Sequence, residues 1–94
     1  MAEALALEKL DALNSAGWVT SEDGTAITKT FKFKSFVQAW GFMSQAAIHA
    51  EKLNHHPEWF NVYNRVEVKL TTHDTGGLSD LDGTLASNMD AIAS

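Results

Sequence analysis

Apolar residues recur at three- and four-residue intervals in three stretches of the chain, which is the spacing of an amphipathic helix. We expect helices at residues 2–16, from residue 35 to residue 53 or 54, and from residue 79 to residue 92. Ser35 and Ser79 stand where the second and third patterns begin, and a serine hydroxyl can accept a hydrogen bond from the first backbone N–H groups of a helix. Gly17 is expected to follow the end of the first helix, because glycine readily adopts a left-handed conformation.

The central pattern carries more apolar residues than one buried face needs. We expect the buried stripe of this helix to consist of Phe36, Trp40, Met43, Ala47 and Ala50. Val37, Phe42 and Ile48 fall outside that stripe, and one sheet face in so small a domain cannot cover them as well. We therefore expect this side of the helix to form a subunit interface. The alternative is that these apolar residues are scattered and exposed.

A first pair of β-strands follows the first helix. Residues 18–20 and 26–33 flank an Asp23-Gly24 pair, which is typical of a tight hairpin turn. The second of these strands alternates apolar and polar residues, so we expect it to bury one face. Lys29 also falls on the apolar side of this strand, where a charged residue is unexpected.

A second pair of strands, at residues 59–63 and 66–72, follows the central helix, with a turn or bulge at Asn64-Arg65. Its aromatic residues are expected in the core or in an interface, or alternatively at the rim of a site for a planar ligand. The elements thus follow in the order α-β-β-α-β-β-α. Paired strands separated by helices favour an antiparallel sheet with the helices on one face, so we expect a single α+β domain over residues 1–94.

Composition excludes several classes of function. The 94 residues include seven Lys and Arg against twelve Asp and Glu, and the resulting net charge of −5 repels a phosphate backbone, so we expect no direct nucleic-acid binding. The chain has no cysteine, which excludes disulfides, a thiolate nucleophile and a zinc–thiolate site. Neither a signal-peptide pattern nor a membrane-spanning run is visible, so we expect a cytoplasmic location and no membrane contact.

Histidines are the most distinctive candidates for chemistry. His55 and His56 adjoin at the end of the predicted central helix, and His73 follows the second strand pair. Imidazole titrates near neutral pH, so several imidazoles in one cleft suit general acid–base catalysis. Glu51 precedes His55 by four residues, one helical turn, and is placed to orient it or to hold its positive charge.

Two alternatives compete with acid–base chemistry. Carboxylates flank the loop after the third histidine, at Asp74 and Asp82, and three histidines with a carboxylate can bind zinc or iron. Adjacent histidines point in different directions, however, so we expect no metal site. A histidine next to Pro57 can also cap the last helical carbonyls, which explains one such histidine but not the set. His49 is expected on the solvated side of its helix.

One set of residues and spacings is specific. It comprises Glu51-x-x-x-His55-His56-Pro57, residues 59–64, Thr71-Thr72-His73 and Asp82. Over nearly the whole chain this pattern resembles the pterin-4a-carbinolamine dehydratase family, which in animals also provides a dimerization cofactor of a homeodomain transcription factor. The resemblance implies a four-stranded antiparallel sheet with three helices packed on one face. It further implies assembly through strand edges and helices into a homo-oligomer, a dimer of dimers.

The family's reaction is loss of water from 4a-hydroxytetrahydropterin, the 4a-carbinolamine, to give quinonoid dihydropterin in tetrahydrobiopterin recycling. By resemblance, the catalytic residues are His55, His56 and His73. Contacts with the pterin are implied for Asn54, His55, His56, Thr71, Thr72, His73 and Asp74. Supporting roles are implied for Glu51, Pro57, Trp59 and Asp82. No metal or organic cofactor is implied, because the elimination of water transfers no electrons.

The residues leave two questions open. One is which histidine acts as the acid and which as the base. The other is whether the chain also works as a protein-binding module, a dimerization cofactor or transcriptional coactivator, which would add a nuclear location. The three histidines favour the enzyme, since a pure scaffold has no use for several imidazoles poised near neutral pH.

Overall fold

The order of elements along the chain is the predicted one. A computed structural model describes residues 3–73 and 76–94. Its elements are α1 (Leu7–Ser15), β1 (Val19–Thr20), β2 (Ala26–Lys32), α2 (Phe36–Leu53), β3 (Glu58–Val62), β4 (Arg65–Thr71) and α3 (Asp80–Ala93).

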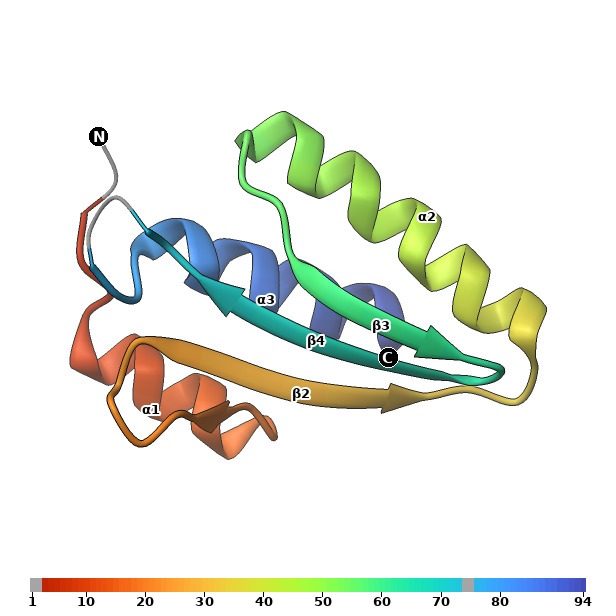
Figure 1. The fold of residues 1–94 in the computed structure, drawn as a ribbon, viewed down its shortest axis with the longest axis horizontal. Coiled ribbons are helices and arrows are strands. Elements are labelled where there is room, and N and C mark those ends of the chain that lie inside the picture. The colour runs from red at the N-terminus through yellow and green to blue at the C-terminus, as the bar shows by residue number, and fades with distance from the viewer. Residues whose placement is uncertain (1–2, 74–75) are drawn as a thin grey trace.

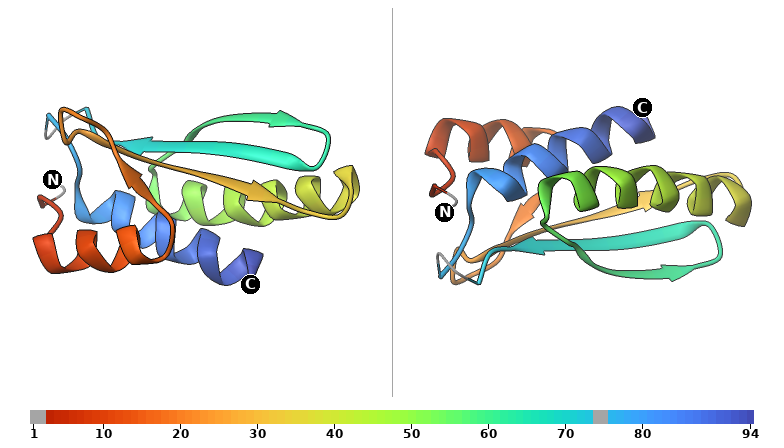
Figure 2. Two further views of the ribbon diagram at one scale, coloured as in Figure 1. Left: turned by 90° about the horizontal axis from the view of Figure 1, so that it is seen from below. Right: turned by 90° about the horizontal axis from the view of Figure 1, so that it is seen from above.

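The strands form one antiparallel sheet in the order β1-β2-β4-β3. The long β2 and β4 lie at the centre, and β1 and β3 form the edges (Figure 1). All three helices pack on one face of this sheet, and the other face is open (Figure 2). The α+β architecture with three helices on one face is therefore confirmed.

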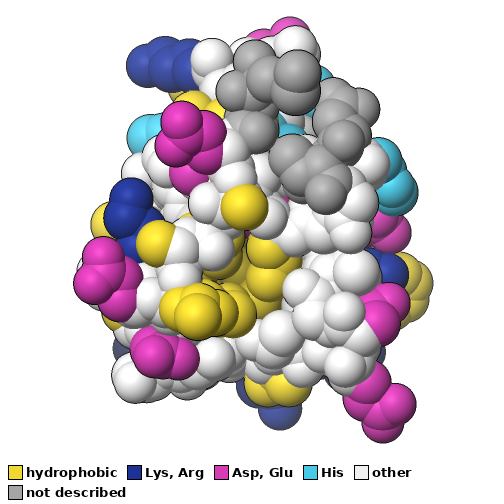
Figure 3. Space-filling view, turned by 90° about the vertical axis from the view of Figure 1, so that its left-hand side faces the viewer, with side chains coloured by type: hydrophobic (Ala, Val, Ile, Leu, Met, Phe, Trp, Pro, Cys, Tyr) yellow, Lys and Arg dark blue, Asp and Glu magenta, His cyan; other side chains and the backbone are white. Residues whose placement is uncertain are grey.

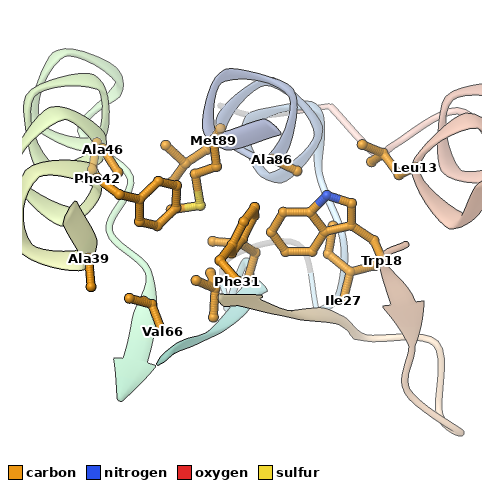
Figure 4. Packing of buried hydrophobic residues seen from close by; sticks show 14 residues of the cluster. Leu13, Trp18, Ile27, Phe31, Ala39, Phe42, Ala46, Val66, Ala86 and Met89 are labelled. Atoms are coloured by element: carbon orange, nitrogen blue, oxygen red, sulfur yellow. The ribbon is translucent and has the colours of Figure 1, made fainter. Parts of the chain in front are cut away.

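The core lies between the sheet and the helices (Figure 4). Phe31 of β2 stands at its centre, with its ring centroid 5.8 Å from that of Trp18 and 4.7 Å from that of Phe42. Met89 of α3 is completely buried in the same cluster. Apolar burial on this scale is the main force that holds the three helices against the sheet.

The first helix begins later than its pattern predicts. It starts at Leu7, and in the preceding segment Ala4 forms a β-bridge with Ser79. The backbone N–H of Leu5 donates to the carbonyl of Leu78 at 3.2 Å. Pairing with the segment that leads into α3 satisfies these backbone groups and competes with helix formation. Gly17 follows the end of α1 with a φ of 107°, as expected.

The predicted buried stripe of α2 is wrong in most positions. The buried residues are Ala39, Phe42, Ala46 and Ala50. Phe36 and Trp40 are instead 51% and 59% exposed, and Ala47 is exposed as well. Both sides of this helix are apolar, so periodicity alone did not choose between them, and the structure turns the side with Phe42 and three alanines towards the core.

The charged residue on the buried side of β2 has a complete set of partners. Lys29 Nζ donates to Asp90 Oδ1 of α3 and to the carbonyl of Ala16, each at 2.7 Å. It also lies 5.0 Å from the ring centroid of Phe31. Trp18 Nε1 donates to the other oxygen of Asp90 at 3.0 Å. The network joins α1, β2 and α3 at one point, which resolves the unexpected position of the lysine.

Two turns shape the sheet. Gly24 has a φ of 75° in the first hairpin, as the Asp23-Gly24 pair predicts. The second turn comprises Tyr63 and Asn64, because Val62 pairs with Arg65; the prediction placed it one residue later. Tyr63 adopts a φ of 50°, which is uncommon for a residue other than glycine, so the sequence did not indicate that the turn includes this residue.

Candidate active site

A buried carboxylate at the start of α3 holds one of the candidate histidines. Asp82 is completely buried, and its Oδ1 lies 2.5 Å from Nε2 of His55. Its Oδ2 accepts hydrogen bonds from Thr72 Oγ1 at 2.6 Å and from the backbone N–H of Ser79 at 3.0 Å. An ionised carboxylate can only accept hydrogen bonds, so this arrangement places the imidazole proton of His55 on Nε2.

The local fold explains why this carboxylate is so well fixed. Ser79 is the N-cap of α3 and Asp82 is its third residue, and together they form a capping box. The hydroxyl groups of Thr72 and Ser79 lie 2.7 Å apart, which ties the end of the β4 segment to the cap. The carboxylate thus serves the helix and the histidine at once.

The two adjacent histidines after α2 point in different directions. Asn54, the C-cap, has a left-handed conformation with a φ of 49°, which asparagine tolerates better than most residues. The His55 N–H donates to the carbonyl of Ala50 at 3.0 Å, so the chain turns sharply here. The His55 side chain is 10% exposed and faces α3, whereas that of His56 is 58% exposed.

Glu51 supports a different histidine from the one predicted. Its Oε1 lies 2.9 Å from Nε2 of His56, and it makes no described contact with His55. The four-residue spacing to His55 assumed a continuing helix, but the left-handed Asn54 breaks that geometry. Because the Glu51 side chain is 82% exposed, the pair orients His56 more than it stabilises the fold.

The three candidate histidines line one hollow of about 290 Å³ at the end of the sheet where β3 begins and β4 ends. Its lining residues are Asn54, His55, His56, Glu58, Lys69, Thr71, Thr72 and His73. Figure 3 shows this end of the molecule, with histidine side chains in its upper half and acidic side chains in both halves. We call this hollow the histidine pocket.

Several predicted site residues lie outside the lining of the pocket. Asp82 and Glu51 stand behind the histidines, as described above. Trp59 packs against the hydrophobic core, and Pro57 is half-buried in the segment before β3. Asp74 lies outside the described residues. His49 on α2 is half-buried, not solvated as predicted, and is not among the residues lining the pocket.

Sequence analysis missed two lining residues, Glu58 and Lys69. They are direct partners across β3 and β4, on the side of the sheet that faces away from the helices. The outward positions of these strands are visible in their alternation, but the pairing register is not, so no sequence signal joined them to the histidines.

The hydroxyl groups at the end of β4 are already engaged. Thr71 Oγ1 donates to the carbonyl of Thr25 at 2.5 Å, and the Thr72 hydroxyl contacts Ser79 and Asp82. Thr72 is buried, so its contribution to the pocket is mainly to hold the carboxylate behind His55.

Within residues 3–73 and 76–94, no group of three or more acidic or histidine side chains is arranged to hold a metal ion. The helices in this part of the chain are also too short or too polar to span a bilayer.

Comparison with known proteins places this geometry in a family. The family model for pterin 4 alpha carbinolamine dehydratase matches residues 2–92. A protein of Rhizobium meliloti (strain 1021) named "Putative pterin-4-alpha-carbinolamine dehydratase" is 58% identical, over 92% of this chain and 89% of its own. A relative of the same name from Novosphingobium aromaticivorans is 62% identical, over 80% of this chain and 78% of its own.

Comparison with solved structures also finds pterin dehydratases. A transcriptional coactivator/pterin dehydratase from Brucella melitensis is 49% identical, covers 98% of this chain and 100% of its own, and superposes with a TM-score of 0.87. A pterin dehydratase-like protein described as a RuBisCO assembly factor in the alpha-carboxysome is 23% identical, covers 82% of this chain and 89% of its own, and has a TM-score of 0.70, a likeness of fold alone. Because the family model matches nearly the whole length of the chain, this chain belongs to the pterin-4a-carbinolamine dehydratase family.

Proposed function

We propose that the protein removes water from 4a-hydroxytetrahydropterin and releases quinonoid dihydropterin, as a step in tetrahydrobiopterin recycling. The observation that carries this proposal is the histidine pocket. Three imidazoles line one hollow, and two of them have a carboxylate of their own, Asp82 behind His55 and Glu51 behind His56. Groups of this kind suit a reaction that needs one proton delivered and one removed.

The reaction balances with two proton transfers. The C4a–O bond breaks as the lone pair of N5 forms a double bond to C4a, and a protonated imidazole gives its proton to the departing oxygen, so that water leaves. A neutral imidazole takes the proton from N5, which yields the quinonoid product. Each transfer by a positioned side chain typically contributes about 10²–10⁴-fold to the rate.

The pocket residues divide these tasks by their surroundings. Asp82 fixes the orientation of His55 and keeps its proton on Nε2, which leaves Nδ1 as the nitrogen without a described partner. His56 and His73 are exposed, so they can meet the substrate with little rearrangement. The exposed amide of Asn54, which lines the same pocket, supplies both a donor and an acceptor for the polar edge of a pterin.

Stopped-flow absorbance of carbinolamine breakdown, with and without the protein, tests this function. We expect an acceleration that saturates with substrate concentration and disappears in the double variant His55→Ala/His73→Ala. A breakdown rate that the wild-type protein leaves unchanged would contradict the proposal.

We further propose that the protein is a homo-oligomer, a dimer of dimers. Four apolar residues of α2 are each more than half exposed: Phe36, Val37, Trp40 and Ile48. We call these residues the α2 apolar face. At the sheet edge, β3 is paired on one side within the described chain. Exposed apolar area of this extent and an unpaired strand edge are both typical of association surfaces.

The α2 apolar face also supports a second candidate function, that of a protein-binding module acting as a dimerization cofactor or transcriptional coactivator. The Brucella relative is described as a transcriptional coactivator as well as a pterin dehydratase. A partner protein would cover the same surface as another copy of the chain. Sedimentation equilibrium of the wild-type protein and of Ile48→Glu distinguishes the two. If the wild-type protein is a tetramer and Ile48→Glu lowers its mass, another copy of the chain covers this surface.

A further inference from the structure

A second hollow lies on the open face of the sheet, directly beside the histidine pocket. Its volume is about 470 Å³, and it is lined by Thr28, Lys29, Thr30, Glu58, Trp59, Phe60, Glu67, Val68 and Lys69. Glu58 and Lys69 line both hollows. A molecule seated against the histidines can therefore extend onto the sheet across these two side chains.

The strand register orders this hollow in two rows. The row beside the histidine pocket consists of Glu58, Lys69 and Thr28, which are partners across three strands. The next row consists of Phe60, Glu67 and Thr30. Residues two apart on a strand are separated by about 7 Å, so the Phe60 row begins one such step beyond the shared residues.

The chemistry of the two rows differs. Glu58 and Lys69 face each other, yet within the described residues neither forms a salt bridge, so both are available to a ligand. Phe60 is 59% exposed, and the other residues of its row, Glu67 and Thr30, are polar. A flat aromatic ring exposed in this way can stack on a planar group of a ligand.

We propose that this second hollow binds the substituent at C6 of the pterin substrate, which makes it a C6 subsite. The inference rests on the proposed function. C6 is separated from the reacting C4a by N5 alone, so with C4a beside the histidines the substituent leaves the ring close to the pocket's border. The subsite extends the substrate class beyond tetrahydrobiopterin, whose short C6 chain carries no planar group, to tetrahydropterins whose C6 chain passes Glu58 and Lys69 and carries a planar group that stacks on Phe60.

Equilibrium binding of two stable ligands tests the C6 subsite. One is 6-methyl-7,8-dihydropterin, whose methyl group cannot reach Phe60, and the other is 7,8-dihydrofolate, whose C6 chain carries an aminobenzoyl ring. In the wild-type protein the longer ligand should bind more tightly. Phe60→Ala should raise its dissociation constant about three- to tenfold, the loss expected for one aromatic stack, and leave that of the methyl ligand unchanged.

Val62→Ala is the matched control, since Val62 lies two residues further along the same face of β3 and does not line the hollow. This variant should bind both ligands like the wild type. Equal effects of Phe60→Ala on both ligands, or none on either, would overturn the C6 subsite. A change of the sedimenting mass in Phe60→Ala would also overturn it, because Phe60 would then belong to a subunit interface. Failure of the wild-type protein to bind either ligand would instead contradict the proposed function itself.

Discussion

Replacing Asp82 by asparagine separates its role in the site from its role in the fold. The two carboxylate oxygens have different partners: Oδ2 holds Thr72 and Ser79, and Oδ1 faces His55. In Asp82→Asn, the amide oxygen can keep the place of Oδ2 and both of its hydrogen bonds. The amide nitrogen then takes the place of Oδ1 and can only donate. To accept that bond, His55 must move its proton from Nε2 to Nδ1.

The consequences for rate and for stability differ in size. The nitrogen of His55 left for the substrate changes from an acceptor to a donor, so we expect turnover to fall by about 10²–10⁴-fold. Stability should change much less. Exchanging one hydrogen bond to a charged group for a neutral one costs ~1 kcal/mol, and losing a negative charge in the first turn of α3 adds a fraction of that.

Stopped-flow kinetics and thermal unfolding of the same samples give both quantities. Asp90→Asn is the matched control, because it makes the same change on the same helix, at the Lys29 and Trp18 network far along α3. This control should lose stability and retain its rate. A folded Asp82→Asn protein with wild-type turnover would refute the reasoning about the His55 tautomer.

Four further outcomes follow from the geometry. His73→Ala should lower turnover by about 10²–10⁴-fold, whereas His49→Ala should leave it nearly unchanged in the same kinetic assay. Phe42→Ala should cost ~3–5 kcal/mol of unfolding free energy in a denaturant titration, because Phe42 is only 2% exposed; the sequence pattern had assigned this residue to an interface. Ile48→Glu, on the α2 apolar face, should lower the mass found by sedimentation equilibrium with little loss of stability. Hydrogen bonds from Thr25 and Ser21 lower the pKa of Asp23 from 3.8 to about 2. Asp23 therefore stabilises the fold fully above pH 3.8 and loses this contribution as the pH falls towards about 2. In Asp23→Asn, the free energy of unfolding should therefore depend less steeply on pH between these values.

The fold was largely predictable because its local signals agree with one another. Ser35 and Ser79 cap the helices that they were expected to begin, and Gly24 makes the first hairpin turn. The failures come from ambiguous or non-local information. The stripe of α2 failed because both of its faces are apolar, and α1 is shortened by pairing with the segment before α3, which no local pattern announces.

The site was predictable as a set of residues and not as a set of contacts. Spacing and family resemblance singled out the three histidines that line the pocket, but Glu51 was assigned to His55 because a continuous helix was assumed. The left-handed Asn54 decides that pairing, and its conformation cannot be read from periodicity. Lys69 escaped notice for a related reason, since its place beside the pocket depends on the register between strands.

The most direct test of the central claim is a single-turnover experiment with the protein in excess over freshly generated 4a-carbinolamine. If the histidine pocket performs the dehydration, the observed rate should rise to a plateau with protein concentration. The plateau should fall to the uncatalysed rate in His55→Ala/His73→Ala and remain in His49→Ala. A plateau that survives in the folded double variant would show that another part of the molecule carries the chemistry and would contradict the account.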